Sequence, residues 1–350
     1  MKKIYLLTLI FSVFTFSLTA QTTDVATGLN YPWGIVFKGD VLYITEAATG
    51  SISKINVNDA NPAPSLVVSG LGTPIELAFN GNDLYINEFD LFKISKINVL
   101  DAVPAPTDVI TGLNNQTYNL QIKDNMLYYG ESVANKISKI NLADSVPAPV
   151  TVAAGFNSVS GITFNGSTLY ISESEGNKIS KINIDDTVPT KVDVITNLSD
   201  QPYTSIIYGN ELYILLASTG KIVKIDLTAT NPTLVEVVTG ISLSRGMAVN
   251  GNSLYISDFL GNKIIKYQLP ALTTTDLSKI SLKVFPNPVL EELRISGLTK
   301  RENYKIFSAT GAIVGKGTVF GNEKIDVKNL IKDMYFLKIE NHNVIKFIKK

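Results

Sequence analysis

The carboxylates are the first residues whose type and spacing suggest chemistry. An acid recurs three residues after a repeated tyrosine in five of six positions, which are Glu46, Glu88, Glu131, Glu173, Leu216 and Asp258. Such a ring could bind a cation through hard oxygen ligands. A residue present in nearly every copy of a repeat is better explained by accepting hydrogen bonds from backbone N–H groups of the adjoining loop. We therefore expect these acids to be structural.

Positions that differ from copy to copy are better candidates for a site. Nine residues before each tyrosine stand Gly34, Glu76, Asn119, Gly161, Thr204 and Gly246. Glu76 and Asn119 supply oxygen ligands, and with a neighbouring acid, Glu88 or Glu131, they could hold calcium or another divalent cation. A metal at this position would activate a water molecule for hydrolysis.

Aromatic residues and one arginine stand a position earlier. The six residues there are Trp33, Ile75, Tyr118, Ser160, Tyr203 and Arg245, with Tyr31 and Phe89 close in sequence. Rings and a guanidinium around a concave mouth could stack a sugar ring or clamp an anionic or peptide ligand. The alternative is that the rings only pack between sheets. We predict that Trp33, Tyr118, Tyr203 and Arg245 bind a glycan, a peptide or a surface protein.

Composition excludes several other chemistries. The chain of 350 residues has no cysteine and one histidine, His342. A thiol nucleophile and a zinc–thiolate site are therefore excluded, and a histidine-dependent triad is nearly excluded before the C-terminal segment. No glycine-rich phosphate loop joins a strand to a helix, so a nucleotide cofactor is not expected.

The zero net charge conceals two unlike segments. Residues 21–270 hold 15 Lys and Arg against 23 Asp and Glu, whereas residues 271–350 hold 14 against 8. An acidic body with a basic tail indicates two domains. The acidic body also argues against nucleic acid as a partner, because phosphate binding requires a basic face.

A repeat of 42 or 43 residues organises the body. A tyrosine recurs at positions 43, 85, 128, 170, 213 and 255, and a lysine and a proline recur with the same spacing. Each unit is predicted to form four short strands, which in the fourth unit are 161–165, 168–172, 178–184 and 192–198. Six such units predict an all-β fold, a six-bladed β-propeller over residues 21–270.

The ends of this segment predict how the ring closes. The sixth unit has no fourth strand, while Asp24–Leu29 matches the fourth-strand pattern of the other units. We therefore expect the N-terminal strand to complete the last blade and to cover its exposed edge.

The N-terminal residues are predicted to be a targeting segment. Two lysines, an apolar run over residues 4–18 and a small residue, Ala20, are typical of a secretory signal peptide over residues 1–20. No second long apolar run follows, so we expect no transmembrane segment in the mature chain.

The C-terminal segment carries a pattern of its own. After a polar linker over residues 271–279, residues 280–350 hold about seven short strand patterns, which predict a small β-sandwich. Phe285–Pro288 (FPNP), Tyr304–Gly311 (YKIFSATG), Tyr335–Ile339 (YFLKI) and the terminal FIKK resemble the C-terminal sorting domain of type IX secretion. The resemblance implies export by that machinery in a Bacteroidetes-type bacterium, removal of the tail, and release or surface attachment of the body. The alternative is an adhesive module.

The propeller resembles a broader family. Residues 169–179 (LYISE…GNKI) and 254–264 (LYISD…GNKI) are similar to blades of NHL-repeat and gluconolactonase-like propellers, which include lactonases, lyases and binding proteins. The lactonases hold a divalent metal with Glu, Asn and Asp near the places of Glu76 and Asn119, but their Glu-Gly-Pro opening is absent here. The lyases use a catalytic histidine, which residues 21–270 lack.

Three functions follow from these observations. We predict a non-catalytic binding module at the cell surface or in the medium. The alternative is a metal-dependent hydrolase of the lactonase type, with Glu76 and Asn119 as metal ligands. A third possibility is a structural protein of the surface layer.

Overall fold

The computed structural model describes residues 22–113, 117–271, 282–296, 298, 301–320, 323–339 and 344–350. The predicted signal peptide, His342 and all but the first residue of the predicted linker lie outside this range. Among the described residues, no helix has the length and apolar character needed to cross a membrane.

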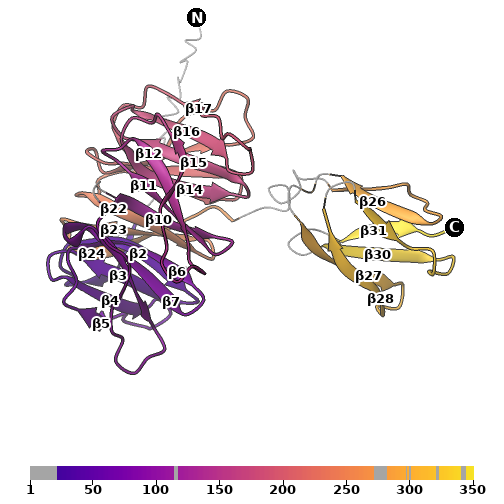
Figure 1. The fold of residues 1–350 in the computed structure, drawn as a ribbon, viewed down its shortest axis with the longest axis horizontal. Coiled ribbons are helices and arrows are strands. Elements are labelled where there is room, and N and C mark those ends of the chain that lie inside the picture. The colour runs from indigo at the N-terminus through magenta and orange to yellow at the C-terminus, as the bar shows by residue number, and fades with distance from the viewer. Residues whose placement is uncertain are drawn as a thin grey trace, which may run out of the picture.

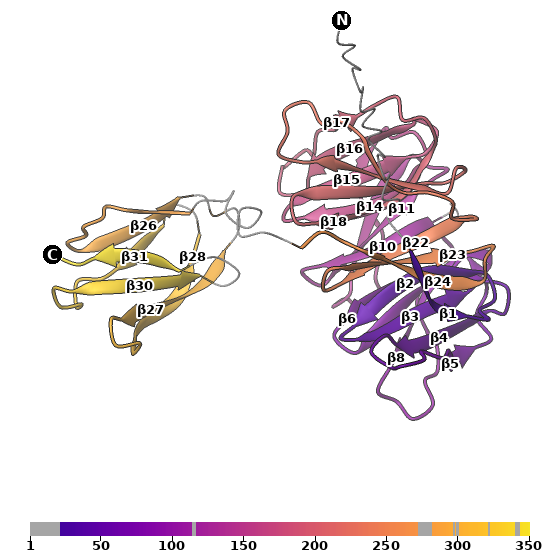
Figure 2. The same cartoon turned by 180° about the vertical axis from the view of Figure 1, so that it is seen from behind.

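Six four-stranded antiparallel sheets form over Thr23–Gln268 in the part of the chain described (Figures 1 and 2). Blade one is β2 (Pro32–Lys38), β3 (Val41–Glu46), β4 (Ser51–Asn56) and β5 (Ser65–Ser69). Blade two is β6 (Pro74–Asn80), β7 (Asp83–Glu88), β8 (Lys93–Asn98) and β9 (Thr107–Ile110), with a 3₁₀ turn, η1 (Phe89–Leu91). Blade three is β10 (Thr117–Lys123), β11 (Met126–Glu131), β12 (Lys136–Asn141) and β13 (Val150–Ala154).

The remaining blades follow the same order. Blade four is β14 (Val159–Asn165), β15 (Thr168–Glu173), β16 (Lys178–Asn183) and β17 (Val192–Ile195). Blade five is β18 (Pro202–Tyr208), β19 (Glu211–Leu216), β20 (Lys221–Asp226) and β21 (Val235–Val238). Blade six is β22 (Ser244–Asn250), β23 (Ser253–Asp258), β24 (Lys263–Gln268) and β1 (Thr23–Thr27). The first strands β2, β6, β10, β14, β18 and β22 contact one another in a closed ring, which confirms the six-bladed propeller.

The N-terminal strand closes the ring as predicted. β1 pairs antiparallel with β24, placing Thr23 beside Lys266 and Thr27 beside Lys263. The Lys263 ammonium forms an ion pair with Asp24 at 2.8 Å. The outer edge of β24 is therefore covered by the other end of the propeller chain.

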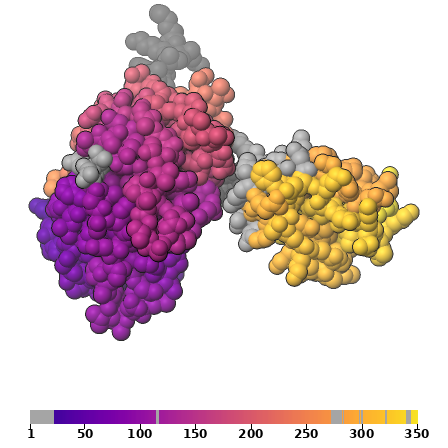
Figure 3. Space-filling model, viewed as in Figure 1, coloured from indigo at the N-terminus to yellow at the C-terminus, as the bar shows by residue number. Residues whose placement is uncertain are grey.

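Apolar side chains fill the spaces between blades. The second strand of every blade is buried along nearly its whole length, because each sheet is covered on both faces. The repeated tyrosines belong to this core: the Tyr43 ring meets Phe79 of the next blade edge-on, with centroids 5.1 Å apart. In the space-filling view the packed blades present a continuous surface (Figure 3).

Every inner strand carries a β-bulge at the same place. The pairing register shifts between Pro74 and Glu76 in β6 and between Pro202 and Thr204 in β18, and at the equivalent points of the other four strands. A bulge redirects side chains that regular pairing would fix. The bulges coincide with the positions at which the sequence repeats differ.

The C-terminal segment forms two sheets around its own core. One sheet has the order β25 (Lys283–Phe285), β26 (Glu292–Ser296) and β29 (Lys324–Asp326). The other has the order β28 (Ile313–Val319), β27 (Glu302–Ser308), β30 (Met334–Ile339) and β31 (Ile345–Ile348). Leu293, Ile306 and Phe347 are buried in one apolar cluster that draws on both sheets. This is the small β-sandwich that the sequence predicted.

Candidate ligand-binding site

One face of the propeller collects the variable positions. Pro32, at the start of β2, pairs with Glu46, at the end of β3, and the other blades repeat this register. The starts of the inner strands and the ends of the second strands therefore share one face, which we call the mouth face. The loops that enter each blade lie there as well.

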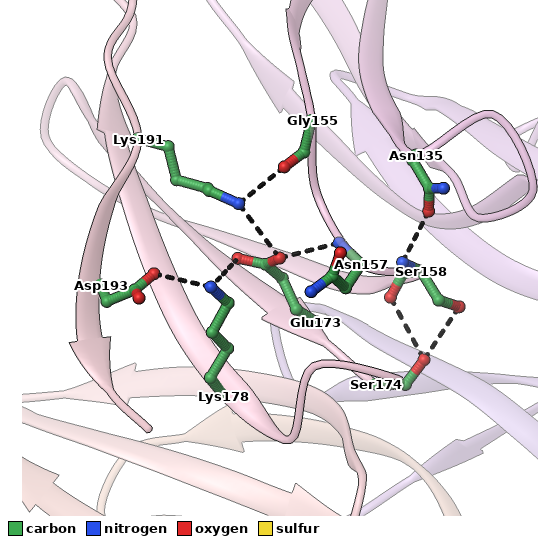
Figure 4. A network of polar contacts seen from close by, with 9 residues as sticks. All are labelled: Asn135, Gly155, Asn157, Ser158, Glu173, Ser174, Lys178, Lys191 and Asp193. Atoms are coloured by element: carbon green, nitrogen blue, oxygen red, sulfur yellow. Dashed lines mark hydrogen bonds and ion pairs between the residues drawn. The ribbon is translucent and has the colours of Figure 1, made fainter. Parts of the chain in front are cut away.

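The repeated carboxylates on this face serve their own blades. Glu173 is fully buried and accepts a hydrogen bond from the backbone N–H of Asn157 at 2.8 Å (Figure 4). Its carboxylate also lies 3.4 Å from the Lys191 ammonium and 3.8 Å from that of Lys178. Lys191 in turn donates to the Gly155 carbonyl at 2.6 Å. Glu173 thus fixes the entering loop to the sheet.

Other blades use the same device. Glu46 accepts from the backbone N–H of Asn30 at 2.8 Å, and Glu88 accepts from that of Gly72 at 2.9 Å. Serines on the third strands donate to Glu46, Glu88 and Glu131. The structural interpretation of these acids is confirmed. Glu88 and Glu131, the neighbouring acids considered as a third ligand beside Glu76 and Asn119, are thus hydrogen-bonded within their own blades.

Blade five departs from this pattern in a concerted way. Leu216 replaces the acid, and Val223 replaces the serine that would donate to it. Asp200 supplies the carboxylate instead, from the entering loop, and accepts from the backbone N–H groups of Ser218 at 2.9 Å and Thr219 at 2.7 Å. Burial opposes ionisation of Asp200, but the hydrogen bonds from Thr219, Gln201 and Ser218 outweigh it and lower its pKa.

The four residues predicted to bind a ligand meet on the mouth face. The Trp33 indole N–H donates to the Tyr203 hydroxyl at 2.9 Å. The Arg245 guanidinium carbon lies 5.2 Å from the Trp33 ring centroid and 4.9 Å from that of Tyr203. Tyr118 meets Tyr203 edge-on, with centroids 6.2 Å apart. Blades one, three, five and six therefore contribute to one cluster.

Phe259 completes this cluster, and sequence reasoning missed it. Its ring centroid lies 5.7 Å from the Arg245 guanidinium and 5.3 Å from the Trp33 ring, and Tyr31 stacks on it at 4.8 Å. We call Trp33, Tyr203 and Phe259 the arginine cage. Phe259 occupies the same repeat position as Phe89, four residues after the repeated tyrosine, and that equivalence was the available signal.

A pocket of about 780 Å³ opens beside the cage. Its walls carry side chains from blades three to six and from Trp33, and they include Tyr118, Ser132, Asn135, Ser158, Ser160, Ser174, Glu175, Gln201, Tyr203, Ser218 and Arg245. This volume lies in the range usual for small-molecule sites. All four residues predicted to bind a ligand line it.

Hydrogen bonds order the serine side of the pocket. The Ser158 hydroxyl lies 2.8 Å from that of Ser132 and 3.0 Å from that of Ser174. The Asn135 side-chain oxygen accepts from the Ser158 backbone N–H at 2.7 Å (Figure 4). Ser160 donates to the Pro202 carbonyl at 2.8 Å. The hydroxyl groups are thus held in place before any ligand arrives.

Polar side chains of the inner strands are hydrogen-bonded to one another near the bulges. The Asn119 amide, in blade three, donates to the Thr204 hydroxyl, in blade five, at 3.2 Å. Blade four stands between them, and its Gly161 lets blades four and five approach closely: a Cβ at Gly161 would lie 2.7 Å from the Tyr203 carbonyl oxygen and 2.8 Å from the Thr204 Cα. The side-chain oxygen of Asn119 is buried without a partner among the described residues.

Glu76 is the most perturbed acid of this region. Burial raises its pKa to about 8, and only 8% of the residue is exposed. Its carboxyl forms no hydrogen bond or ion pair with another described residue, so it is mostly protonated at neutral pH. Among the described residues, no group of three or more acids, histidines or cysteines is arranged to hold a metal ion. Glu76 and Asn119 would therefore offer a cation two side chains that carry oxygen ligands.

Comparisons with known proteins agree with both parts of this architecture. Residues 283–350 match the family model of the secretion system C-terminal sorting domain. A search of curated protein sequences finds no match to the chain. A gluconolactonase from Xanthomonas campestris superposes with a TM-score of 0.59 at 12% identity, covering 72% of this chain and 90% of that one.

Other solved structures share the propeller. Virginiamycin B lyase from Staphylococcus aureus superposes with a TM-score of 0.55 at 17% identity, over 71% of this chain and 99% of the lyase. A chain of a nidogen/laminin complex reaches 0.51 at 17% identity, over 59% of this chain and 80% of that one. At these identities the likeness concerns the fold alone. The chain therefore combines a β-propeller, a fold it shares with these solved structures, with a segment over residues 283–350 that matches the secretion system C-terminal sorting domain.

Proposed function

We propose that the propeller is a non-catalytic binding module that captures a ligand in the pocket of the mouth face. The observation that carries this proposal is that Trp33, Tyr118, Tyr203 and Arg245 converge on one pocket of about 780 Å³. These residues stand where the blades differ from one another, as side chains selected for a ligand rather than for the blade would do.

The state of the pocket hydroxyls supports binding rather than catalysis. A serine nucleophile requires a neighbouring base that accepts its proton. The hydroxyls of Ser132, Ser158 and Ser174 bond to one another, and that of Ser160 bonds to a backbone carbonyl. The single histidine of the chain lies outside the propeller.

The fold itself is compatible with either role. The similar structures include a gluconolactonase and a lyase, but also a chain of a nidogen/laminin complex. The sorting domain points to secretion or cell-surface attachment. We infer that the type IX machinery exports the chain by recognising this domain, and that the mature body acts outside the cell.

A pocket-filling variant tests the binding role. Ala217 lines the pocket at the repeat position that holds Phe89 and Phe259 in other blades, so Ala217→Phe is compatible with the blade. Ala47→Phe, at the same position of blade one, is the matched control because Ala47 does not line the pocket. A glycan array, followed by titration of the hits against Trp33 fluorescence, should find binding that Ala217→Phe abolishes and Ala47→Phe retains. Equal binding by both variants would place the ligand elsewhere.

A metal-dependent hydrolase is the second candidate. It is favoured by the unpartnered side-chain oxygen of Asn119 and by the unpaired, buried carboxyl of Glu76, which stands on the neighbouring inner strand. Calcium, manganese and zinc should be titrated against Trp33 fluorescence and thermal unfolding, with Glu76→Gln and Asn119→Ala. A saturable shift lost in both variants would support a metal site and justify a screen of lactones and esters. No shift with any metal would reject this candidate.

A further inference from the structure

We propose that the ligand of the mouth-face pocket is an acidic carbohydrate, a uronic-acid oligosaccharide whose carboxylate pairs with Arg245. This inference rests on the proposed binding function and names the chemical class of the ligand. It is carried by an unpaired guanidinium in a pocket that is also lined by several hydroxyl and amide groups.

Arg245 is held in place by rings and leaves its charge unpaired. Trp33, Tyr203 and Phe259 lie within 5.7 Å of its guanidinium carbon. It forms no hydrogen bond or ion pair with another described residue, and its Nε is buried without a partner. Cation–π contacts fix the guanidinium plane but do not saturate its donors. A planar carboxylate can accept two of these N–H groups in parallel.

No carboxylate among the described residues forms an ion pair with the Arg245 guanidinium. Glu175 also lines the pocket, but its side chain is exposed and therefore screened by water. A carboxylate would thus be the natural partner of Arg245.

The other polar side chains of the pocket indicate the rest of the ligand. Ser132, Ser158, Ser174, Asn135 and Gln201 present hydroxyl and amide groups, each able to donate and accept. These groups match the many hydroxyls of a sugar better than the alternating apolar side chains of a peptide. The cage rings contact Arg245 and one another, so of the two modes expected from the sequence, stacking on a sugar ring and clamping of an anionic ligand, the arrangement favours the second.

The test compares acidic and neutral oligosaccharides on the mature chain. Calorimetric titrations should compare trigalacturonic acid with its methyl ester and with maltotriose. A tetrapeptide with a free C-terminal carboxylate serves as the peptide probe. We expect trigalacturonic acid to bind at least tenfold more tightly than its ester or maltotriose, and the preference to fall as salt is raised. Arg245→Gln should remove the preference. Lys38→Gln should retain it, because Lys38 also lies over a ring, Phe79 at 5.0 Å, but outside the pocket.

Each outcome decides a different claim. Equal binding of acidic and neutral sugars, blocked by Ala217→Phe, would overturn the acidic class and leave the binding function standing. Binding of the peptide carboxylate alone would also overturn it. If neither these probes nor a glycan array bind in the pocket, both proposals fail. An unchanged circular dichroism spectrum of Arg245→Gln would show that its lost preference for the acidic sugar is not caused by unfolding. Arg245→Lys keeps the positive charge but cannot donate two parallel hydrogen bonds to a carboxylate, so it should bind trigalacturonic acid with intermediate affinity.

Discussion

At the scale of single residues, Glu76 ties the stability of the propeller to pH. Its pKa of about 8 in the folded state lies above the ordinary value of 4.5. Between these values the folded chain keeps a proton that the unfolded chain releases, so the free energy of unfolding decreases as pH rises from about 4.5 to 8. Burying this carboxyl is therefore least costly in acid.

Replacing Glu76 by glutamine should remove this dependence. Glu76→Gln keeps the shape but cannot ionise, so it should match the parent near pH 4.5 and exceed it at pH 8.5 by on the order of 4 to 5 kcal/mol. Denaturant unfolding followed by Trp33, the single tryptophan, would measure the difference. The exposed Glu175→Gln serves as the control. Parallel pH profiles for Glu76→Gln and the parent would contradict an uncharged Glu76.

The sequence predicted part of the site because aligning the six repeats shows which residues differ from the others at a shared position. Trp33, Tyr118, Tyr203 and Arg245 were recognisable as departures from a shared position, and all four line the pocket. The bond from Asn119 to Thr204 was not predictable, because it joins blades that are not neighbours in the ring. Such distances across the channel depend on ring geometry rather than on spacing along the chain.

At the scale of elements, blade five shows that a blade tolerates a change of hydrogen-bond scheme when both partners change. Leu216 and Val223 are apolar where the first three blades pair an acid with a serine, and Asp200 anchors the loop instead. The carboxylate has moved from the end of the second strand to the entering loop. Its role of accepting backbone N–H groups is unchanged.

Restoring the common acid alone should destabilise this blade. Leu216→Glu would bury a carboxylate that lacks the serine donor, replaced here by Val223, and would add a second acid beside the loop that Asp200 already anchors, at a cost of about 3 kcal/mol. Adding Val223→Ser and Asp200→Asn should recover a large part of the loss, since the acid then gains a donor and loses a like charge. Unfolding in urea, measured on the single, double and triple variants, gives the coupling. Strictly additive effects would contradict the concerted exchange.

The strands were largely predictable, and their irregularities were not. The repeat placed the four strands of each unit and the completion of blade six by residues 24–29, both of which the pairing confirms. The bulges of the inner strands leave no mark in a pattern of apolar residues, because one inserted residue changes the pairing and not the run of apolar side chains. Tyr203 and Arg245 both stand within such bulges.

At the scale of the whole molecule, the two folded parts have separate cores and separate expected tasks. The propeller strands end at Gln268, and the C-terminal sheets begin at Lys283. Buried residues of the sandwich, such as Leu293 and Phe347, cluster among themselves. We therefore expect the C-terminal sorting domain and the ligand-binding propeller to function independently of each other.

Deleting residues 283–350 should abolish export without altering the propeller. In a bacterium with type IX secretion, the truncated chain should remain in the periplasm, while Trp33 fluorescence reports an unchanged unfolding temperature. Fusing residues 271–350 to an unrelated periplasmic carrier should send that carrier outside the cell. Export of the truncated chain, measured by immunoblotting of medium and surface fractions, would contradict a sorting role for the tail.

The closure of blade six by β1 also means that one blade is built from both ends of the propeller segment, and this has a consequence for the folding rate. Lys263 and Asp24 meet across 239 residues, so the last blade is assembled from the two ends of the propeller and must form after most of the chain has been made. Until then β24 is an unpaired edge open to other chains. Joining Gln268 to Thr23 by a copy of the loop between β4 and β5, and opening the chain between β21 and β22, would make every blade contiguous. This permutant should refold faster and aggregate less during refolding, although its native contacts are the same.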